Sequence, residues 1–502
     1  MDVLDAAAVR AWAVAARRAL ELARDRIDAV NVFPVADRDT GTNVLLTVTG
    51  GADALAAAPD AAGADEAARV LARGAMLAAR GNSGVIVSQY LAGFARALVP
   101  AAGPADVARA LVAAARAARE STGDPQEGTV LTLADAVGQG ARVAVDAGAG
   151  LDAMLRQASA DAHGSLAAIS AAHPLLQAAH VVDAGACALL VVLDSLTAAV
   201  EGAEGDLDLD WLPAAGPRPA AAPDEGGAYE VMLLVSASGG EDLADALLAA
   251  MRRVGDSVAV VGTEAIWHVH VHTDDPEAAI EAAALGRREQ VVVRLVDAPH
   301  LPGTWPVDPP ERGSRWGVVA CTPSAPLARW YAGAGAVALV ACPEVPVRAG
   351  HVLRAVTDTG AASVAVLPGE VVSADQLGTL LDDEHAGPVV EVLGAADELA
   401  VAVAALALAG SEASAVRTRA AVEALSRLRV AEGADASAPA VVALIDVVRD
   451  VAPDAEAATV LHRDPLGAGV SAEVAAAAEL RGLEVAFVGP TGRGPAVVVG
   501  LD

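Results

Sequence analysis

The spacing of the apolar residues changes once along this chain, and that change limits what the chain can fold into. Up to about residue 203, apolar residues recur every three to four positions, as in Val3–Ala29, which is typical of helices. From residue 228 the period falls to two, the period of strands. Glu201–Gly227, between the two regions, is rich in proline, glycine, alanine and acidic residues, as linkers are. The pattern therefore predicts an all-helical N-terminal domain followed by domains that contain sheets.

Residues 228–300 alternate short strands and helices. Strands are expected at Glu230–Ala237, Ser257–Gly262, Ile266–Thr273 and Gln290–Val296, and helices at Glu241–Val254 and Asp275–Leu285. The order βαββαβ indicates a small α+β domain with helices on one face of its sheet. The remaining chain alternates strands and helices as in a doubly wound, parallel α/β sheet, and its last glycine-rich turn, 489–495, is interpreted as hairpin-like. The predicted domains are 1–203, 228–300 and 315–502, joined by linkers 204–227 and 301–314.

Composition excludes several classes of partner and mechanism. The net charge of −31 disfavours nucleic acid and anionic membrane surfaces as partners. All 34 basic residues are arginine, which excludes phosphate chemistry that depends on lysine. We find no apolar run of the ~18 residues needed to span a bilayer, no cationic start of a secretory signal, and no paired cysteine spacing. We therefore expect a cytoplasmic protein with no transmembrane segment.

One turn-prone stretch, Asn31–Asn43, concentrates oxygen ligands in the sequence N-V-F-P-V-A-D-R-D-T-G-T-N. Asp37 and Asp39 lie one residue apart among hydroxyl and amide side chains. Such hard oxygen ligands suit Mg²⁺, with phosphate oxygens completing its shell. Asp, Thr and Asn are also common helix N-caps, so the residues leave two interpretations open, a metal–phosphate site and a capped loop.

Three further segments place polar residues at the start of helices. G-N-S-G at Gly81–Gly84 begins a helix, where free backbone N–H groups suit a phosphate, although a tight helix junction would use the same residues. E-G-T-V-L-T at Glu127–Thr132 opens another helix, for which Thr129 is a candidate N-cap. V-V-D-A-G-A-C-A-L at Val181–Leu189 precedes an apolar helix.

These four segments resemble motifs of the bacterial fatty acid kinase family: N-V-F-P-V-P-D-G-D-T-G-T-N, A-R-G-N-S-G-V-I-L-S-Q, E-G-T-I-L-T and V-D-A-G-G-x-G. In that family the N-terminal domain is similar to the nucleotide-binding (DhaL) subunit of dihydroxyacetone kinase, a helical barrel. The resemblance implies that the four segments meet at one end of the barrel. This chain departs from the motifs at Ala36, which replaces proline, and at Arg38, Ala186 and Ala188, which replace glycines.

The resemblance implies an ATP- and Mg²⁺-dependent kinase that phosphorylates a fatty acid carboxylate presented by a DegV-type binding protein. Asp37 and Asp39 would be the catalytic residues and metal ligands, with Asn31 as a further ligand. Residues implied in nucleotide binding are Thr40, Thr42, Asn43, Gly81, Asn82, Ser83, Gly84, Thr129, Asp183 and Gly185. A dihydroxyacetone-type small-molecule kinase and a nucleotide-binding regulator without turnover remain alternatives, and Arg38 favours the regulator.

His268, His270 and His272 alternate along one predicted strand. Same-face positions on a strand are ~7 Å apart, so neighbouring imidazoles could share a metal, but the two-residue period by itself favours a solvent-facing polar strand. The segment resembles the family's K-V-H-V-H-T. Relatives often have a cysteine near the first strand of this domain that could join two of these histidines at a metal, where this chain has Ala228 or Tyr229. A homodimer interface or docking surface is therefore as well supported as a zinc site.

In the family, the C-terminal domain engages the DegV-type partner. The family's M-N-P-S and L-P-N-x-x-N motifs are not found here, and only Leu367–Pro368 matches the second.

Overall fold

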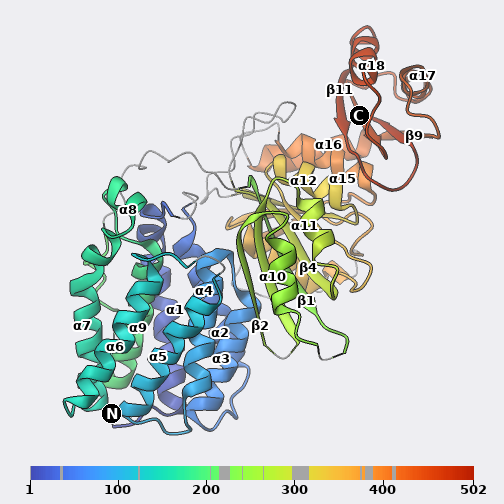
Figure 1. Cartoon of the computed structure of the whole chain (residues 1–502). Coiled ribbons are helices and arrows are strands. Elements are labelled where there is room, and N and C mark those ends of the chain that lie inside the picture. Colours follow the sequence, from blue (N-terminus) through green and yellow to red (C-terminus); the bar gives the residue numbers. More distant parts are fainter. Residues whose placement is uncertain are drawn as a thin grey trace. The chain divides into compact units, whose positions relative to one another are not determined.

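The computed structural model describes residues 2–33, 38–122, 125–203, 205–213, 227–239, 241–263, 265–296, 316–373, 376–378, 388–409 and 414–502. Its N-terminal part is a bundle of antiparallel helices, as predicted (Figure 1). These helices are α1 (Ala6–Ala29), α2 (Thr40–Ala56), α3 (Ala64–Ala78), α4 (Gly81–Ala97), α5 (Pro104–Glu120), α6 (Val130–Asp146), α7 (Leu151–Ser170), α8 (Pro174–Ala179) and α9 (Ala184–Glu201).

The bundle core is built largely from small side chains. Along α1 the buried face includes Val9, Ala13, Ala16 and Leu20, at the helical spacing seen in the sequence. Helix α9 is apolar almost all round, and most of it is buried in the same core. By length and composition α9 could cross a membrane, but 72% of it is buried inside the structure, as is usual for a core helix. Among the described residues α9 is thus one weak candidate for a spanning segment, where no apolar run of that length was expected.

The beginning of the first predicted linker packs against the helices. Leu212 is buried in the bundle core, and the Trp211 ring lies 4.5 Å from the ring of His163 on α7. Arg26 of α1 donates hydrogen bonds to the backbone carbonyls of Leu212 and Pro213. These contacts fix residues 205–213 to the bundle, although their acidic composition suggested a solvated segment.

The strands between residues 229 and 392 belong to one eight-stranded sheet of order β2-β3-β1-β4-β6-β5-β7-β8. Its strands are β1 (Tyr229–Ser236), β2 (Asp256–Thr263), β3 (Ile266–Thr273), β4 (Arg287–Leu295), β5 (Trp316–Thr322), β6 (Val337–Val340), β7 (Ser363–Leu367) and β8 (Val389–Val392). Associated helices are α10 (Ala244–Met251), α11 (Pro276–Ala282), α12 (Ala325–Gly333), α13 (Ala349–Asp358), α15 (Glu398–Ala409) and α16 (Ser414–Arg427).

The pairing of β4 with β6 was not expected. The two strands are antiparallel, with Val292 opposite Leu339, and they join the α+β strands to the α/β strands in one sheet. The predicted parallel arrangement is confirmed where β5 pairs with β6 and β7, and where β7 pairs with β8. The multidomain α, α+β and α/β fold class is therefore confirmed, with the two sheet regions continuous.

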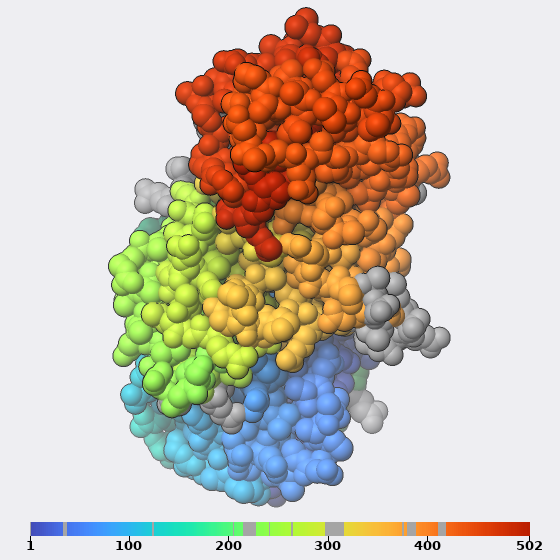
Figure 2. All heavy atoms as spheres, turned by 90° about the vertical axis from the view of Figure 1, so that its right-hand side faces the viewer, coloured from blue at the N-terminus to red at the C-terminus, as the bar shows by residue number. Residues whose placement is uncertain are grey.

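The last strands form a separate sheet of order β11-β10-β12-β9. They are β9 (Arg429–Gly433), β10 (Ala457–His462), β11 (Glu484–Val488) and β12 (Val497–Leu501), packed with α17 (Ala438–Arg449) and α18 (Val470–Glu479) around a valine-rich core. In the space-filling view these residues, in red, form a closely packed lobe (Figure 2). Because β10 lies between β11 and β12, the turn at 489–495 crosses over β10, and its interpretation as hairpin-like is wrong.

Candidate functional site

The loop after α1 and the start of α4 are joined through Thr40, the first residue of α2. Its hydroxyl donates a hydrogen bond to Asn31 Oδ1 and lies 3.1 Å from the Ser83 hydroxyl. Asn31, Asp39 and Thr40 are all buried. The structure thus brings together a predicted metal ligand, Asn31, and a predicted phosphate contact, Ser83. Asp37, which was predicted as a metal ligand together with Asn31 and Asp39, lies outside the described residues, so the pairing of Asp37 with Asp39 stays a prediction.

A residue of the preceding helix caps α2. Asp39 stands at the N-cap position, but its side chain makes no capping hydrogen bond. Instead, the Asp28 carboxylate accepts hydrogen bonds from Gly41 N at 2.6 Å, Thr42 N at 3.1 Å and the Thr42 hydroxyl at 2.7 Å. Burial raises the pKa of Asp28 to about 6, and the nearby Asp39 carboxylate adds to the rise. Asp28 therefore satisfies these donors of α2 in place of Asp39.

Sequence reasoning did not identify Asp28 as part of this site. One signal could have done so, because Asp28 lies in the last turn of α1, where the helix dipole disfavours a negative charge. An acidic residue in that position needs hydrogen-bond donors from elsewhere in the fold, and here they come from α2.

Two glycines allow α2 to approach its neighbours. A Cβ atom on Gly41 would lie 2.5 Å from the backbone oxygen of Arg24, so α2 begins directly against α1. Gly81 has φ +54°, and a Cβ atom there would lie 2.2 Å from Nδ2 of Asn43. Gly81 and Asn43, both implied in nucleotide binding, are therefore in contact at a tight α2–α4 junction. Asn82, Ser83 and Gly84 complete the first turn of α4.

Arg38 occupies a backbone conformation that suits glycine. Its φ is +59°, in the left-handed region, where an L-residue with a side chain is strained by about 1–2 kcal/mol. The family motif has glycine at this position, and the structure supplies the physical reason. Arg38 therefore places both strain and a positive charge next to Asp39.

Helices α6 and α9 also begin side by side. Thr129 caps α6 with its hydroxyl, which confirms its expected role as an N-cap. Asp183 caps α9 and accepts hydrogen bonds from Ala186 N and Val130 N, both at 2.8 Å. Burial raises the pKa of Asp183 to about 6. One carboxylate thus fixes the N-termini of two helices, and a Cβ atom on Gly185 would lie 3.2 Å from it and 3.2 Å from Val130 Cβ.

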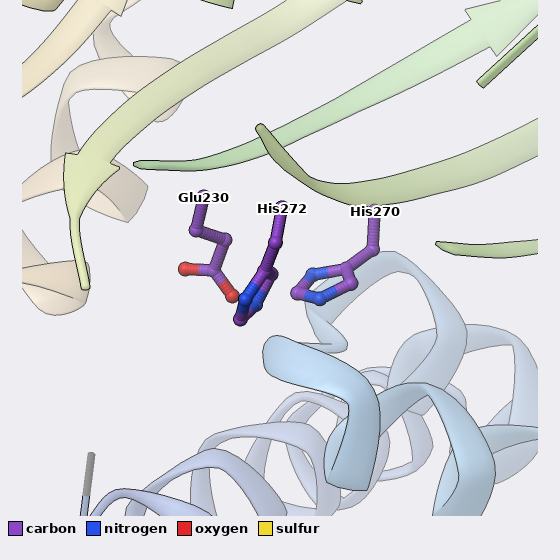
Figure 3. A group of neighbouring side chains, drawn as sticks. All are labelled: Glu230, His270 and His272. Carbon is purple, nitrogen blue, oxygen red and sulfur yellow. The ribbon is translucent and has the colours of Figure 1, made fainter. Parts of the chain in front are cut away.

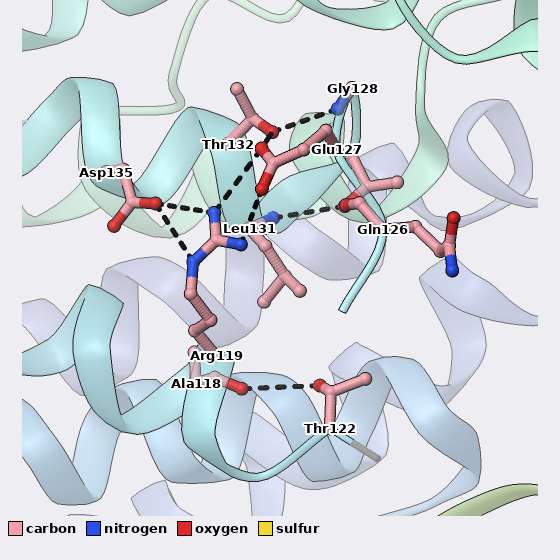
Figure 4. Close-up of polar contacts among 10 residues, drawn as sticks. Ala118, Arg119, Thr122, Gln126, Glu127, Gly128, Leu131, Thr132 and Asp135 are labelled. Carbon is pink, nitrogen blue, oxygen red and sulfur yellow. Dashed lines mark hydrogen bonds and ion pairs between the residues drawn. The ribbon is translucent and has the colours of Figure 1, made fainter. Parts of the chain in front are cut away.

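The glutamate of E-G-T-V-L-T holds its loop in place (Figure 4). Arg119 at the end of α5 lies 2.7 Å from Glu127 and 2.6 Å from Asp135 of α6. Thr132 donates its hydroxyl to Glu127 at 2.6 Å and accepts from Gly128 N at 2.9 Å. The hydrogen bond from Arg119 is the main cause of the lowered pKa of Glu127. These contacts give Glu127 a structural role at the start of α6.

All four segments lie at one end of the bundle. The Phe33 ring, after α1, lies 4.1 Å from the ring of His173, before α8. A Cβ atom on Gly128, before α6, would lie 2.7 Å from His173 N. Together with the Thr40–Ser83 contact and the hydrogen bond from Val130 N to Asp183, these contacts connect every predicted segment. The opposite end holds the chain start, where Leu4 forms a β-bridge with Ala102.

This arrangement suits a polyanion and a hard cation. The N-termini of α2, α4, α6 and α9 are gathered at one end, and their backbone N–H groups and dipoles favour negative charge. The Asp39 carboxylate, the Asn31 amide oxygen and the Thr40 hydroxyl form a set of oxygen donors that fits Mg²⁺. Because the chain has no lysine, phosphate charge has to be met by metal, backbone, hydroxyl groups or arginine.

The histidine strand, β3, holds a second group of interest. His268, His270 and His272 are 0–4% exposed, so the solvent-facing interpretation is wrong. Glu230 on the adjacent strand β1 joins His270 and His272, with one ligand atom from each within 4.8 Å of the others (Figure 3). His268 is not part of this group. The carboxylate of Glu230 was not considered from the sequence, because only pairing of the strands brings it to the histidines.

Comparisons with known proteins find matches to two parts of the chain. Residues 34–198 match the family model of the DAK2 domain, and residues 226–297 match that of the FakA-like middle domain of fatty acid kinase. Protein YloV of Bacillus subtilis (strain 168) is 30% identical over 267 residues, which are 50% of this chain and 48% of the relative. An uncharacterized protein of Staphylococcus saprophyticus is 28% identical over 272 residues, with the same shares covered. The match thus spans about half the length of these curated relatives.

The helical bundle and its converging helix N-termini therefore define a DAK2-domain protein. Its second matched region is more specific: residues 226–297 are similar to the middle domain of FakA-like fatty acid kinase, in agreement with the resemblance seen in the motifs.

Proposed function

We propose that this protein is an ATP-dependent phosphotransferase whose acceptor is a fatty acid carboxylate presented by a DegV-type binding protein. The observation that carries the proposal is the Asn31–Thr40–Ser83 contact beside buried Asp39, at the end of the bundle where four helices begin. The same end provides donors for phosphate and oxygen ligands for a cation, as a nucleotide–metal complex requires.

Each residue of the site has a proposed task. Asp37, Asp39 and Asn31 would hold Mg²⁺, which when bound neutralises phosphate charge. Thr40, Asn43 and the first turn of α4, Gly81–Gly84, would bind the nucleotide phosphates through hydroxyl, amide and backbone N–H groups. Thr42, also implied in nucleotide binding, would act indirectly, because its N–H and hydroxyl groups donate to Asp28. Thr129, Asp183 and Gly185 would set the positions of the α6 and α9 N-termini through the capping contacts described above.

The acceptor chemistry fits the residues present. A carboxylate oxygen forms a bond to the γ-phosphorus, the bond from that phosphorus to the β,γ-bridging oxygen breaks, and the products are acyl phosphate and ADP. No proton has to be removed, because a carboxylate is already ionised near neutral pH. The site would therefore act by positioning and charge neutralisation, without a general base.

Arg38 gives a specific reason to keep a second candidate, a nucleotide-binding regulator without turnover. Its guanidinium stands next to Asp39 in the chain and could take the place of one cation. A kinase of dihydroxyacetone or a related small molecule is a third candidate, but a hydroxyl acceptor usually requires a positioned base. We further propose that the chain acts in the cytoplasm, that its α/β region engages the DegV-type partner, and that the middle region forms a homodimer.

Binding of ATP with and without Mg²⁺ tests the site. We expect Asp39→Ala and Asp39→Asn to weaken Mg²⁺-dependent ATP binding by roughly tenfold or more while the circular dichroism spectrum stays unchanged, because a carboxylate ligand is lost. Asp152→Ala is the control, since Asp152 is an acidic residue in the first turn of α7, at the opposite end of the bundle. Unchanged ATP affinity in both Asp39 variants would overturn the proposed site.

Turnover assays separate the three candidates. Acyl phosphate formed only with an acyl-loaded DegV-type protein would support the fatty acid kinase. Phosphorylation of dihydroxyacetone alone would support the small-molecule kinase, and ATP binding without turnover under either condition would support the regulator.

A further inference from the structure

His173 is a polar residue outside the four motif segments, yet it lies between two of them. It follows α7 and is the N-cap residue of α8. Its ring centroid lies 4.1 Å from that of Phe33, in the segment after α1. A Cβ atom on Gly128, before α6, would lie 2.7 Å from the backbone nitrogen of His173. His173 therefore belongs to the end of the bundle where the proposed nucleotide-binding segments gather.

One nitrogen of this imidazole is buried without a partner. His173 is 5% exposed, and its Nδ1 has no hydrogen-bond partner among the described residues. The side chain also makes no capping hydrogen bond to α8, although it stands at the N-cap position. A buried polar atom without a partner destabilises the folded state. In a native structure such an atom indicates a group that a ligand or a water completes.

The imidazole suits an uncharged part of a ligand. Burial lowers the pKa of His173 below its usual value of 6.5, so the ring is neutral near pH 7. A neutral imidazole offers a phosphate no positive charge and at most one N–H group at each ring. The edge of a purine base carries both donors and acceptors, so it can pair with either tautomer, and its flat face can pack on aromatic rings.

The chain connects this ring pair to the proposed phosphate site. Asn31 lies two positions before Phe33 and accepts a hydrogen bond from Thr40. The Thr40 hydroxyl in turn lies 3.1 Å from that of Ser83. Two residues of chain span at most about 7 Å. One nucleoside triphosphate can therefore reach both places, with its phosphates at Thr40 and Ser83 and its base at His173.

We propose that His173 contacts the base of the bound nucleotide through Nδ1 and that His173 and Phe33 together line the base subsite. This inference rests on the proposed function, because it requires the helix N-termini to hold a triphosphate. It assigns base recognition to the junction of α7 and α8, which none of the four motif segments includes.

The competing explanation is that His173 only fills space beside Phe33. A ring without nitrogens would then serve equally well, and nucleotide affinity would not depend on Nδ1. His173→Phe separates the two explanations, since phenylalanine keeps a flat ring and removes both nitrogens. His173→Asn complements it, because the asparagine amide can place a donor or an acceptor near the position of Nδ1.

Calorimetric titration of the full-length chain with two probes measures the effect. The probes are Mg²⁺–ATP and Mg²⁺–tripolyphosphate, which has no base. We expect His173→Phe to lower ATP affinity by roughly tenfold, as loss of one buried hydrogen bond does, and to leave tripolyphosphate affinity within about twofold. His173→Asn is expected to stay within about threefold of the wild type for both probes. Leu175→Ala is the control, since Leu175 lies on α8, is 42% exposed and should change neither affinity.

The two probes also separate failure of this inference from failure of the proposed function. Equal ATP affinities of wild type and His173→Phe would overturn the inference and leave the nucleotide site standing. An equal loss of affinity for ATP and tripolyphosphate in His173→Phe would also overturn it, since the substitution would then have disturbed the whole site. Wild-type protein that binds neither probe would refute the proposed function, and the inference with it.

Discussion

The cap that Asp28 provides to α2 can be tested by comparing two substitutions, Asp28→Asn and Asp28→Ala. Asparagine keeps an acceptor oxygen for Gly41 N and Thr42 N, whereas alanine removes it. Loss of a helix cap costs about 1–2 kcal/mol, and each buried N–H group left without an acceptor costs about 1–3 kcal/mol. We therefore expect Asp28→Ala to be less stable than Asp28→Asn by about 2–4 kcal/mol.

The charge of Asp28 acts in the opposite direction. Burial raises its pKa from 3.8 to about 6, so ionisation at pH 7 costs the folded state about 3 kcal/mol relative to a protonated carboxyl group. Asparagine resembles the protonated group but cannot accept from the Thr42 hydroxyl, which loses about 1 kcal/mol. Asp28→Asn is thus expected to be as stable as the wild type at pH 7, or more stable by up to about 2 kcal/mol.

Urea unfolding monitored by circular dichroism measures these differences, and Mg²⁺–ATP titration measures the consequence for the site. We expect Asp28→Ala to weaken nucleotide binding by roughly tenfold, because the first turn of α2 carries Thr40 and follows Asp39, while Asp28→Asn stays within about threefold. Asp25→Ala is the control, since Asp25 lies on the same helix and its side chain is 78% exposed. Equal stability of the two Asp28 variants would refute the capping role, whether or not the protein binds ATP.

Two further predictions concern strain and pH. Arg38→Gly is expected to raise the unfolding free energy by up to about 1 kcal/mol. The reason is that relief of about 1–2 kcal/mol of backbone strain exceeds the entropy cost of glycine. A loss of stability in urea unfolding would contradict this. Buried Glu398, which accepts hydrogen bonds from Tyr331 at 2.9 Å and Thr322 at 3.1 Å, has a pKa raised by burial from 4.5 to about 6. The raised pKa of Glu398 adds about 2 kcal/mol to the stability of the folded state below pH 4.5, and this contribution is lost as the pH rises through 6. Glu398→Gln should remove that part of the pH dependence, and identical melting-temperature profiles of wild type and variant between pH 4 and 7 would show the assignment to be wrong.

Short-range patterns in the sequence were enough for much of the fold. Apolar residues at helical spacing predicted α1, and the G-N-S-G segment that begins at Gly81 predicted the start of α4. Such local signals suffice because a helix is stabilised by contacts between residues three to four positions apart. Thr129 was identified as an N-cap for the same reason, since a cap bonds to residues next to it in the chain. The family motifs added the convergence of four segments, which spacing alone could not indicate.

What the tertiary structure decided depends on residues distant in sequence. Asp28 caps a helix that begins after a loop, and Asp183 also accepts from Val130, 53 positions away. Glu230 meets His270 and His272 only because β1 lies beside β3, and β4 joins the two sheet regions only by pairing with β6. A strand pattern fixes which side chains share a face, but it does not specify which strand lies next to it. For that reason the sequence by itself determined most of the elements and indicated the candidate site residues, and the packing of those elements decided which residues meet.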